Sequence, residues 1–262
     1  MLPLLSFILI VIAGWAAGAL INYLADVLPY RRRPAYPFCL VCEARFPLAN
    51  YLLLPRECPD CGSKRRPRTW LVELVSIAAA VWLWRSPPDD MGFAAGLLLL
   101  VYFGVVVVID MEYRLILHPV SIAGSLIGLG IGTWLHGFTA TVLGGVVGFS
   151  LMLAFYYLGA LFSRFIARRR GIVVGAGEAL GFGDVNLSGV LGLILGWPLI
   201  LPTLFLSILI GGVVSLVYML VMLASRRYQV LMAIPYGPFL VSGAVLLIFF
   251  QDAVLSRLFP YL

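Results

Sequence analysis

Long apolar runs, separated by short polar segments, follow one another along the whole chain. A helix needs about 20 apolar residues to cross the hydrocarbon core of a bilayer. The runs predict eight such helices, at about residues 4–28, 70–86, 92–110, 117–135, 138–162, 183–200, 202–223 and 233–251. The first run has no basic residues before it and is too long for a cleaved signal peptide, so it predicts a retained helix. The pattern predicts an all-α polytopic membrane protein.

The composition indicates that a bilayer is the solvent for most of this chain. Of the 262 residues, 62% are hydrophobic and 11% are charged, whereas soluble domains carry about 25% charged residues. A soluble core could not bury so much apolar surface, so lipid must cover the rest.

The basic residues predict how the chain is oriented. Eight spans divide the connections between two sides, and all of the eighteen Lys and Arg residues except Arg85 and Arg257 fall on one side, within residues 29–69, 111–116, 163–182 and 224–232. The positive-inside rule places that side in the cytoplasm and both termini outside. Topology and contact with anionic membrane lipids explain the net charge of +6, so we expect no nucleic-acid partner.

All four cysteines lie in one cytoplasmic segment. Cys39 and Cys42 form one CxxC pair, and Cys58 and Cys61 form another after fifteen intervening residues. This spacing is typical of a structural Zn²⁺ site. The alternative is four free thiols or a redox pair, but a segment this short needs a staple, and the cytoplasm disfavours disulfides. We therefore expect a first transmembrane helix (1–29), a zinc module (30–69) and a transmembrane core (70–262).

Six acidic residues within or at the ends of the predicted helices are candidates for function, because a carboxylate in hydrocarbon is costly. They are Asp26, Glu73, Asp110, Glu112, Asp184 and Asp252. Asp26 and Asp252 lie near helix ends and Glu73 could face the zinc module, so a structural role is the simpler explanation for these three. Asp110 ends the descending third span and Asp184 begins the ascending sixth, which predicts the same depth on the cytoplasmic side.

Two apposed carboxylates are what aspartic proteolysis requires. Like charges at close range cannot both ionise, so the pair shares a proton. The ionised member activates a water molecule, and the protonated member stabilises the developing oxyanion. Gly181 and Gly183 lack side chains and could let an extended peptide backbone approach Asp184. The sequence therefore predicts Asp110 and Asp184 as catalytic residues.

Other chemistries are harder to build from this sequence. The two histidines, His118 and His136, stand apart, and there is no Gly-x-Ser-x-Gly elbow, HExxH pair or P-loop. The two acids could instead form a polar pair for helix packing or a relay in a proton-coupled transporter. A transporter, however, is expected to carry half-repeats and broken helices near the midplane of the membrane.

These residues resemble the bacterial prepilin peptidases, also called type IV leader peptidases, which are aspartic proteases with a GxGD signature. The similar segments, in chain order, are Gly18–Asn22 with Leu28-Pro29, the four cysteines, Tyr51–Leu54, Leu71–Leu74, Ile109–Glu112 with Pro119, Gly181–Asp184 and Ile234–Phe239. The GxGD signature alone is also found in other intramembrane proteases, which leaves cleavage of other membrane peptides as an alternative. The complete order is specific to the family.

The resemblance implies an enzyme of the bacterial inner membrane that cleaves the basic leader of type IV prepilins and type II secretion pseudopilins at the cytoplasmic face. It also implies N-methylation of the new N-terminus with S-adenosylmethionine, as in many members. Two positions depart from the family. Asn186 replaces a usual lysine, so a cation that could tune the dyad is absent. Arg56 replaces a frequent glycine, and it could fill the space of the methyl donor or contact its carboxylate.

Overall fold

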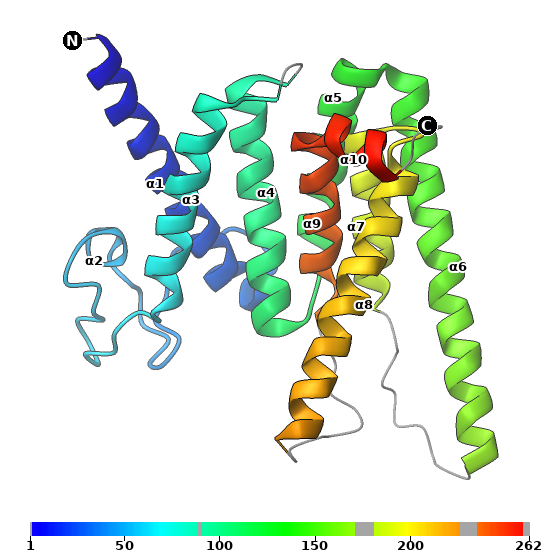
Figure 1. Ribbon diagram of the computed structural model, residues 1–262. Helices are drawn as coiled ribbons and strands as arrows, with labels where there is room; N and C mark the ends of the chain where they lie inside the picture. Colours follow the sequence, from blue (N-terminus) through cyan, green and yellow to red (C-terminus); the bar gives the residue numbers. More distant parts are fainter. Residues whose placement is uncertain (1, 89–90, 171–180, 226–234, 259–262) are drawn as a thin grey trace. The chain divides into compact units, whose positions relative to one another are not determined.

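The computed structural model describes residues 2–88, 91–170, 181–225 and 235–258, which are almost entirely helical (Figure 1). The helices are α1 (Leu2–Arg31), α2 (Leu48–Leu52), α3 (Arg68–Arg85), α4 (Gly92–Tyr113), α5 (His118–His136), α6 (Phe138–Arg170), α7 (Phe182–Leu195), α8 (Ile200–Ala224), α9 (Gly237–Phe249) and α10 (Gln251–Leu258). The chain divides into two compact units, Met1–Tyr113 and Arg114–Leu262.

Helices occupy all eight predicted spans, but not all are long membrane helices. Within the described residues, α1, α4, α6 and α8 are long and apolar enough to cross a membrane. The pair α9 and α10 meets the same criteria together, with a bend of 97° between the two helices, and gives a fifth candidate. The prediction of an all-helical, multi-pass protein is confirmed, whereas the number of eight crossings stays a prediction.

The first unit is built on α1, which packs against α3 and α4. Glycines allow the close approach of α1 and α3: a Cβ added at Gly18 would lie 2.7 Å from the Cα of Glu73. Residues 32–67 connect α1 to α3 and contain α2 together with the four cysteines. The first unit therefore holds the cysteine segment and the helix that ends near Asp110.

The second unit surrounds α7, the helix that begins near Asp184. From Asp184 to Leu195, every residue except Asn186 and Leu193 is buried. Fourteen residues span about 21 Å, which is shorter than the ~30 Å hydrocarbon core. The helix packs mainly against α6 and α5, and a Cβ added at Gly192 would lie 2.1 Å from the carbonyl oxygen of Gly144. The backbones of α6 and α7 are thus in direct contact.

We expect Gly192→Ala to destabilise the protein, because its methyl group has no room against Gly144 and overpacking typically costs about 1–3 kcal/mol. Gly130→Ala is the matched control, since a Cβ at Gly130 in α5 meets nothing within 4 Å. Thermal unfolding in detergent should show a lower midpoint for Gly192→Ala only. Equal midpoints for the two variants would contradict the close contact of α6 and α7.

Candidate functional site

Asp184 is fixed at the start of α7. The N–H of Gly181 donates to Oδ2 of Asp184 over 3.1 Å, and the N–H of Asp184 donates to the carbonyl of Gly181 over 3.0 Å. The carboxylate thus accepts a hydrogen bond from the backbone N–H of the residue that precedes the helix. It also lies at the positive end of the helix dipole. The side chain is also buried, with 8% of Asp184 exposed. These contacts hold the carboxylate at a defined position.

The two glycines beside Asp184 have different surroundings. A Cβ added at Gly183 would lie 2.8 Å from the Cβ of Ile116, so the connection before α5 leaves no room for a side chain there. A Cβ added at Gly181 would meet Oδ2 of Asp184 at 3.4 Å, an ordinary contact, and Gly181 itself is exposed. Gly183 therefore has a packing reason to be glycine, and Gly181 is the more accessible of the two for an approaching peptide.

Asp110 lies in the last turn of α4 and is 4% exposed. It belongs to the first compact unit, and Asp184 belongs to the second. Each carboxylate is thus buried at one end of a helix within its own unit. The apposition of Asp110 and Asp184 stays a prediction.

Asn186 and Asp184 lie on opposite sides of α7. Two residues correspond to about 200° around a helix. Asn186 and Phe182 line a groove of about 670 Å³ between α5, α6 and α7, and Asp184 is not among its lining residues. A cation at position 186 would therefore not point toward the Asp184 carboxylate, so the departure from the family at this position leaves the surroundings of Asp184 unchanged.

Tyr236 is a residue near Asp184 to which the sequence assigned no role. It directly precedes α9, is partly buried and lies within electrostatic reach of the Asp184 carboxylate. Its ring packs edge-on against Phe239, with 6.1 Å between the ring centroids. The signal that could have identified it is its place in Pro235–Phe239, within the last segment that resembles the family.

A buried ionic network joins the cysteine segment to the helices of the first unit. Asp26 of α1 accepts hydrogen bonds from Tyr51 at 2.7 Å, from Arg65 at 3.0 Å and from Arg68. Arg68 also donates to Glu112 of α4 over 2.6 Å. These contacts support the structural role expected for Asp26, because two arginines compensate its charge within the protein. The network also reaches α4 two residues beyond Asp110.

Arg56 folds inward from the cysteine segment and forms a second buried ion pair. Its Nη2 donates to Glu73 over 2.9 Å and to the carbonyl of Leu52 over 2.8 Å. The guanidinium also lies over the ring of Trp70, 4.1 Å from the centroid. The expectation that Glu73 faces the zinc module is therefore confirmed. Nε and Nη1 of Arg56, Oε1 of Glu73 and Oδ1 of Asn22 are buried without a partner in the described part of the chain.

The two CxxC pairs form nearly identical loops. The N–H groups of Glu43 and Gly62 donate to the carbonyls of Cys39 and Cys58, each over 2.9 Å, and both residues have positive φ, of 59° and 67°. A single bridge closes each loop, between Phe38 and Arg45 in the first and between Glu57 and Lys64 in the second. Two backbone turns of the same form thus present two thiols each.

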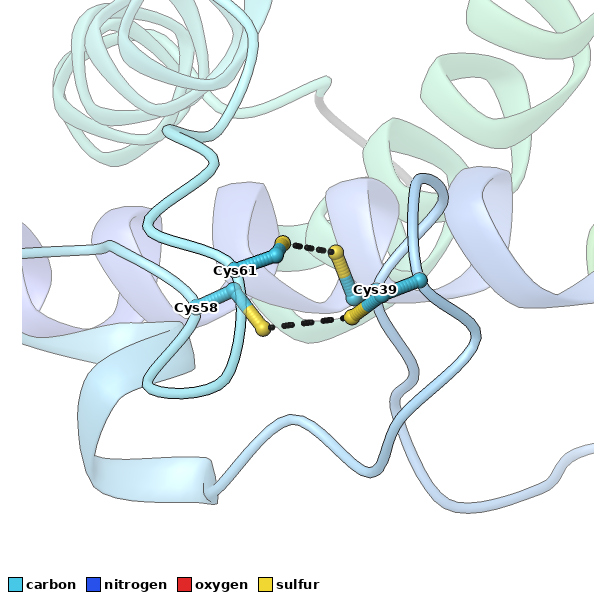
Figure 2. A group of neighbouring side chains, drawn as sticks. Cys39, Cys58 and Cys61 are labelled. Atoms are coloured by element: carbon cyan, nitrogen blue, oxygen red, sulfur yellow. Dashed lines mark hydrogen bonds between the residues drawn. The ribbon is translucent and has the colours of Figure 1, made fainter.

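The four thiols converge on one point, as predicted (Figure 2). All four sulfur atoms lie within 4.8 Å of one another, with 3.6 Å between those of Cys39 and Cys61 and 3.7 Å between those of Cys42 and Cys58. Sulfurs about 2.3 Å from a tetrahedral zinc ion lie about 3.8 Å apart, whereas a disulfide requires about 2.05 Å. The geometry therefore fits a metal ion and not two disulfides.

Electrostatics also favour a metal-binding thiolate at Cys39. Burial would raise the pKa of the Cys39 thiol, but the backbone N–H groups of Cys42 and Val41 and the neighbouring thiols lower it to about 7. By contrast, burial and hydrogen bonds between thiols raise the pKa of Cys42 and Cys61. Zinc binds the deprotonated form of cysteine. This cluster can therefore hold zinc, with Cys39, Cys42, Cys58 and Cys61 as its ligands.

Comparison with known proteins gives a consistent result. Residues 93–216 match the model of the type IV leader peptidase family. A prepilin leader peptidase/N-methyltransferase of Stutzerimonas stutzeri is 29% identical over 250 residues, which cover 92% of this chain and 78% of the relative. A type 4 prepilin-like proteins leader peptide-processing enzyme of Escherichia coli is 33% identical over 214 residues, covering 78% of this chain and 70% of the relative. No solved structure matches.

We expect the purified protein to contain a single zinc ion per chain, and Cys58→Ser to lose it. Elemental analysis by mass spectrometry measures the metal, and limited proteolysis of residues 30–69 reports on folding of the module, which should become more sensitive in this variant. Ser63→Ala in the same loop is the control, because Ser63 contacts Cys58 and Cys61 through its backbone, which the substitution keeps. Wild-type protein without zinc, or with intact disulfides, would contradict the assignment.

Proposed function

Because the chain belongs to the type IV leader peptidase family, we propose that it is a membrane aspartic endopeptidase that uses Asp110 and Asp184 to cleave leader peptides from prepilins and pseudopilins. The observation that carries this proposal is the burial of both carboxylates at helix ends, with Asp110 4% and Asp184 8% exposed. Buried carboxylates in such a setting are rarely retained without a use in the membrane. The names of the relatives support the substrate class.

The surroundings of Asp184 support a specific role for it in the proposed reaction. The start of α7 and the N–H of Gly181 stabilise a negative charge, so Asp184 is the ionised general base and Asp110 is the protonated acid. Asp184 takes a proton from water as the water oxygen bonds to the scissile carbonyl carbon, and Asp110 donates its proton to the carbonyl oxygen. Asp184 then gives its proton to the amide nitrogen while Asp110 takes a proton back from a hydroxyl of the tetrahedral intermediate. The C–N bond breaks, the carboxylic acid and amine products leave, and both acids return to their starting states. Gly181, and to a lesser degree Gly183, leaves room for the extended substrate backbone.

The proposed arrangement in the membrane follows the charge pattern of the sequence. Eight helices cross the inner membrane, both termini lie outside, and residues 30–69 and the dyad face the cytoplasm. The first helix (1–29), the zinc module (30–69) and the core (70–262) then follow one another along the chain, and the first helix packs against helices of the core. A basic leader would remain in the cytoplasm, while the apolar helix of the substrate enters the bilayer beside the dyad.

A second activity, N-methylation of the cleaved product, is supported by the names of the relatives and by the buried cluster around Arg56. The amino-acid end of S-adenosylmethionine carries a carboxylate and an ammonium group. Nε and Nη1 of Arg56 are unused donors, and Oε1 of Glu73 is an unused acceptor, which is the pair of charges that such a zwitterion requires. Arg56 and Glu73 would therefore hold the methyl donor beside the zinc module, where it supplies the methyl group.

We expect Asp110→Asn and Asp184→Asn each to abolish cleavage of a synthetic prepilin peptide, because the roles of the two acids are complementary. Loss of acid–base catalysis alone typically costs about 10²–10⁴-fold, and loss of the dyad should cost more. Asp252→Asn, at an exposed acid in α10, is the control and should keep full turnover. Near-normal cleavage by either dyad variant would overturn the assignment, and cleavage only of unrelated membrane peptides by the wild type would point to another protease class.

We expect Arg56→Ala to keep cleavage but to lose methylation, because it removes the donors for the carboxylate of the methyl donor. Mass spectrometry of the cleaved pilin N-terminus, after reaction with S-adenosylmethionine, detects the added methyl group. Lys64→Ala is the matched control, since Lys64 is an exposed cation of the same module. Zinc content shows that the module is intact. Undiminished methylation by Arg56→Ala would place the donor elsewhere, and an unmethylated product of the wild type would reduce the protein to a peptidase.

A further inference from the structure

The zinc module exposes three leucines at the start of α2 and directly after its end, which we name the leucine edge (Leu48, Leu53 and Leu54). These side chains are 50%, 61% and 74% exposed. The opposite side of α2 points inward, where Tyr51 packs with Phe46 in the small core of the module. Adjacent exposed leucines in a small polar module indicate a surface that is covered in the functional protein.

The leucine edge adjoins a membrane-spanning helix. A groove of about 320 Å³ lies between α1 and α2, lined by apolar and aromatic side chains that include Trp15, Leu20, Leu48 and Leu52. Within the described residues, α1 is one of the helices long and apolar enough to cross a membrane, over Leu4–Arg31. Tyr23, which also lines the groove, precedes Arg31 by eight residues, or about 12 Å of helix. The groove therefore extends along the part of α1 that lies in the hydrocarbon.

The same apolar surface continues on the other side of the edge, toward α3. Arg56, which follows Leu54 and Pro55, packs its guanidinium against Trp70 in the first turn of α3. Trp70, Leu71 and Leu74 are 53%, 62% and 67% exposed. Exposed apolar side chains thus occur on α1, at the leucine edge and on the first turns of α3, with the stacked Arg56 and Trp70 between the last two. Because α1 is long and apolar enough to cross the membrane, lipid covers its exposed face. The leucine edge lies beside that face, so we expect lipid to cover the leucine edge as well.

We propose that the zinc module is anchored in the cytoplasmic leaflet, with its leucine edge among phospholipid acyl chains and one chain in the groove between α1 and α2. The basic side chains of the module suit this position. Arg32 and Arg33, which directly follow α1, are exposed, and such cations attract anionic headgroups at a membrane surface. Lipid then holds the module from one side, and the ion pairs of Asp26 and Glu112 hold it from the other.

Photo-crosslinking of the full chain tests this proposal. Benzoylphenylalanine is introduced at Leu53, at Lys64 of the same module and at Ile12, an exposed residue on the membrane-spanning part of α1. Each variant is placed in nanodiscs of phosphatidylethanolamine and phosphatidylglycerol, irradiated and analysed by mass spectrometry, and its zinc content shows that the module is folded. We expect phospholipid adducts at residues 53 and 12 and none at residue 64.

If a protein rather than lipid covers the leucine edge, the cross-linked adducts at residue 53 will differ. Adducts of residue 53 with a second copy of the chain, or with an added prepilin peptide in place of lipid, would overturn the proposal and identify a protein interface. Lipid adducts at residue 12 with none at residue 53, in zinc-loaded protein, would overturn it as well and place the module in water. Because peptide cleavage is not part of the readout, the result is independent of the dyad assignment.

Discussion

Compensation of buried charge is the constraint on which the first unit depends. Asp26 sits in a membrane-spanning helix, where an unpaired carboxylate would be very costly. Tyr51, Arg65 and Arg68 surround it, and Arg68 continues to Glu112. Removing one partner of such a buried pair typically costs about 3–5 kcal/mol, because the remaining charge is left uncompensated. The network therefore fixes the module, α1, α3 and α4 together, and with them the end of α4 that carries Asp110.

The zinc module depends on the same contacts because its own core is small. Its buried residues are Cys39, Phe46, Tyr51 and Cys58, with Tyr23 of α1 packed against them. So few apolar contacts do not order about forty residues, and a metal ion held by the four cysteines would supply the missing free energy. Tyr51 belongs to both systems, because its ring packs in this core and its hydroxyl donates to Asp26. Metal binding and charge compensation are thus physically linked.

The second unit fixes Asp184 in a different way, through close backbone packing. The short helix α7 is buried among its neighbours, and it meets α6 through glycines such as Gly144 and Gly192. A helix held on several sides cannot tilt or shift in the bilayer, so its first turn stays in place. The N–H of Gly181 then orients the carboxylate. A rigid helix end of this kind is suited to general base catalysis, which requires a defined position for the reacting oxygen.

The sequence by itself determined the helices, the zinc ligands and the candidate acids, because hydrophobic runs, CxxC spacing and charge in hydrocarbon are local signals. Only the tertiary structure decided which partners neutralise the buried charges. Arg68 is 42 residues from Asp26 and 44 from Glu112, and no local pattern connects them. The sequence likewise did not predict that Gly183 packs against Ile116, or that Asn186 lies on the side of α7 away from Asp184. Such contacts depend on how helices far apart in the chain meet, and that is decided by packing in three dimensions.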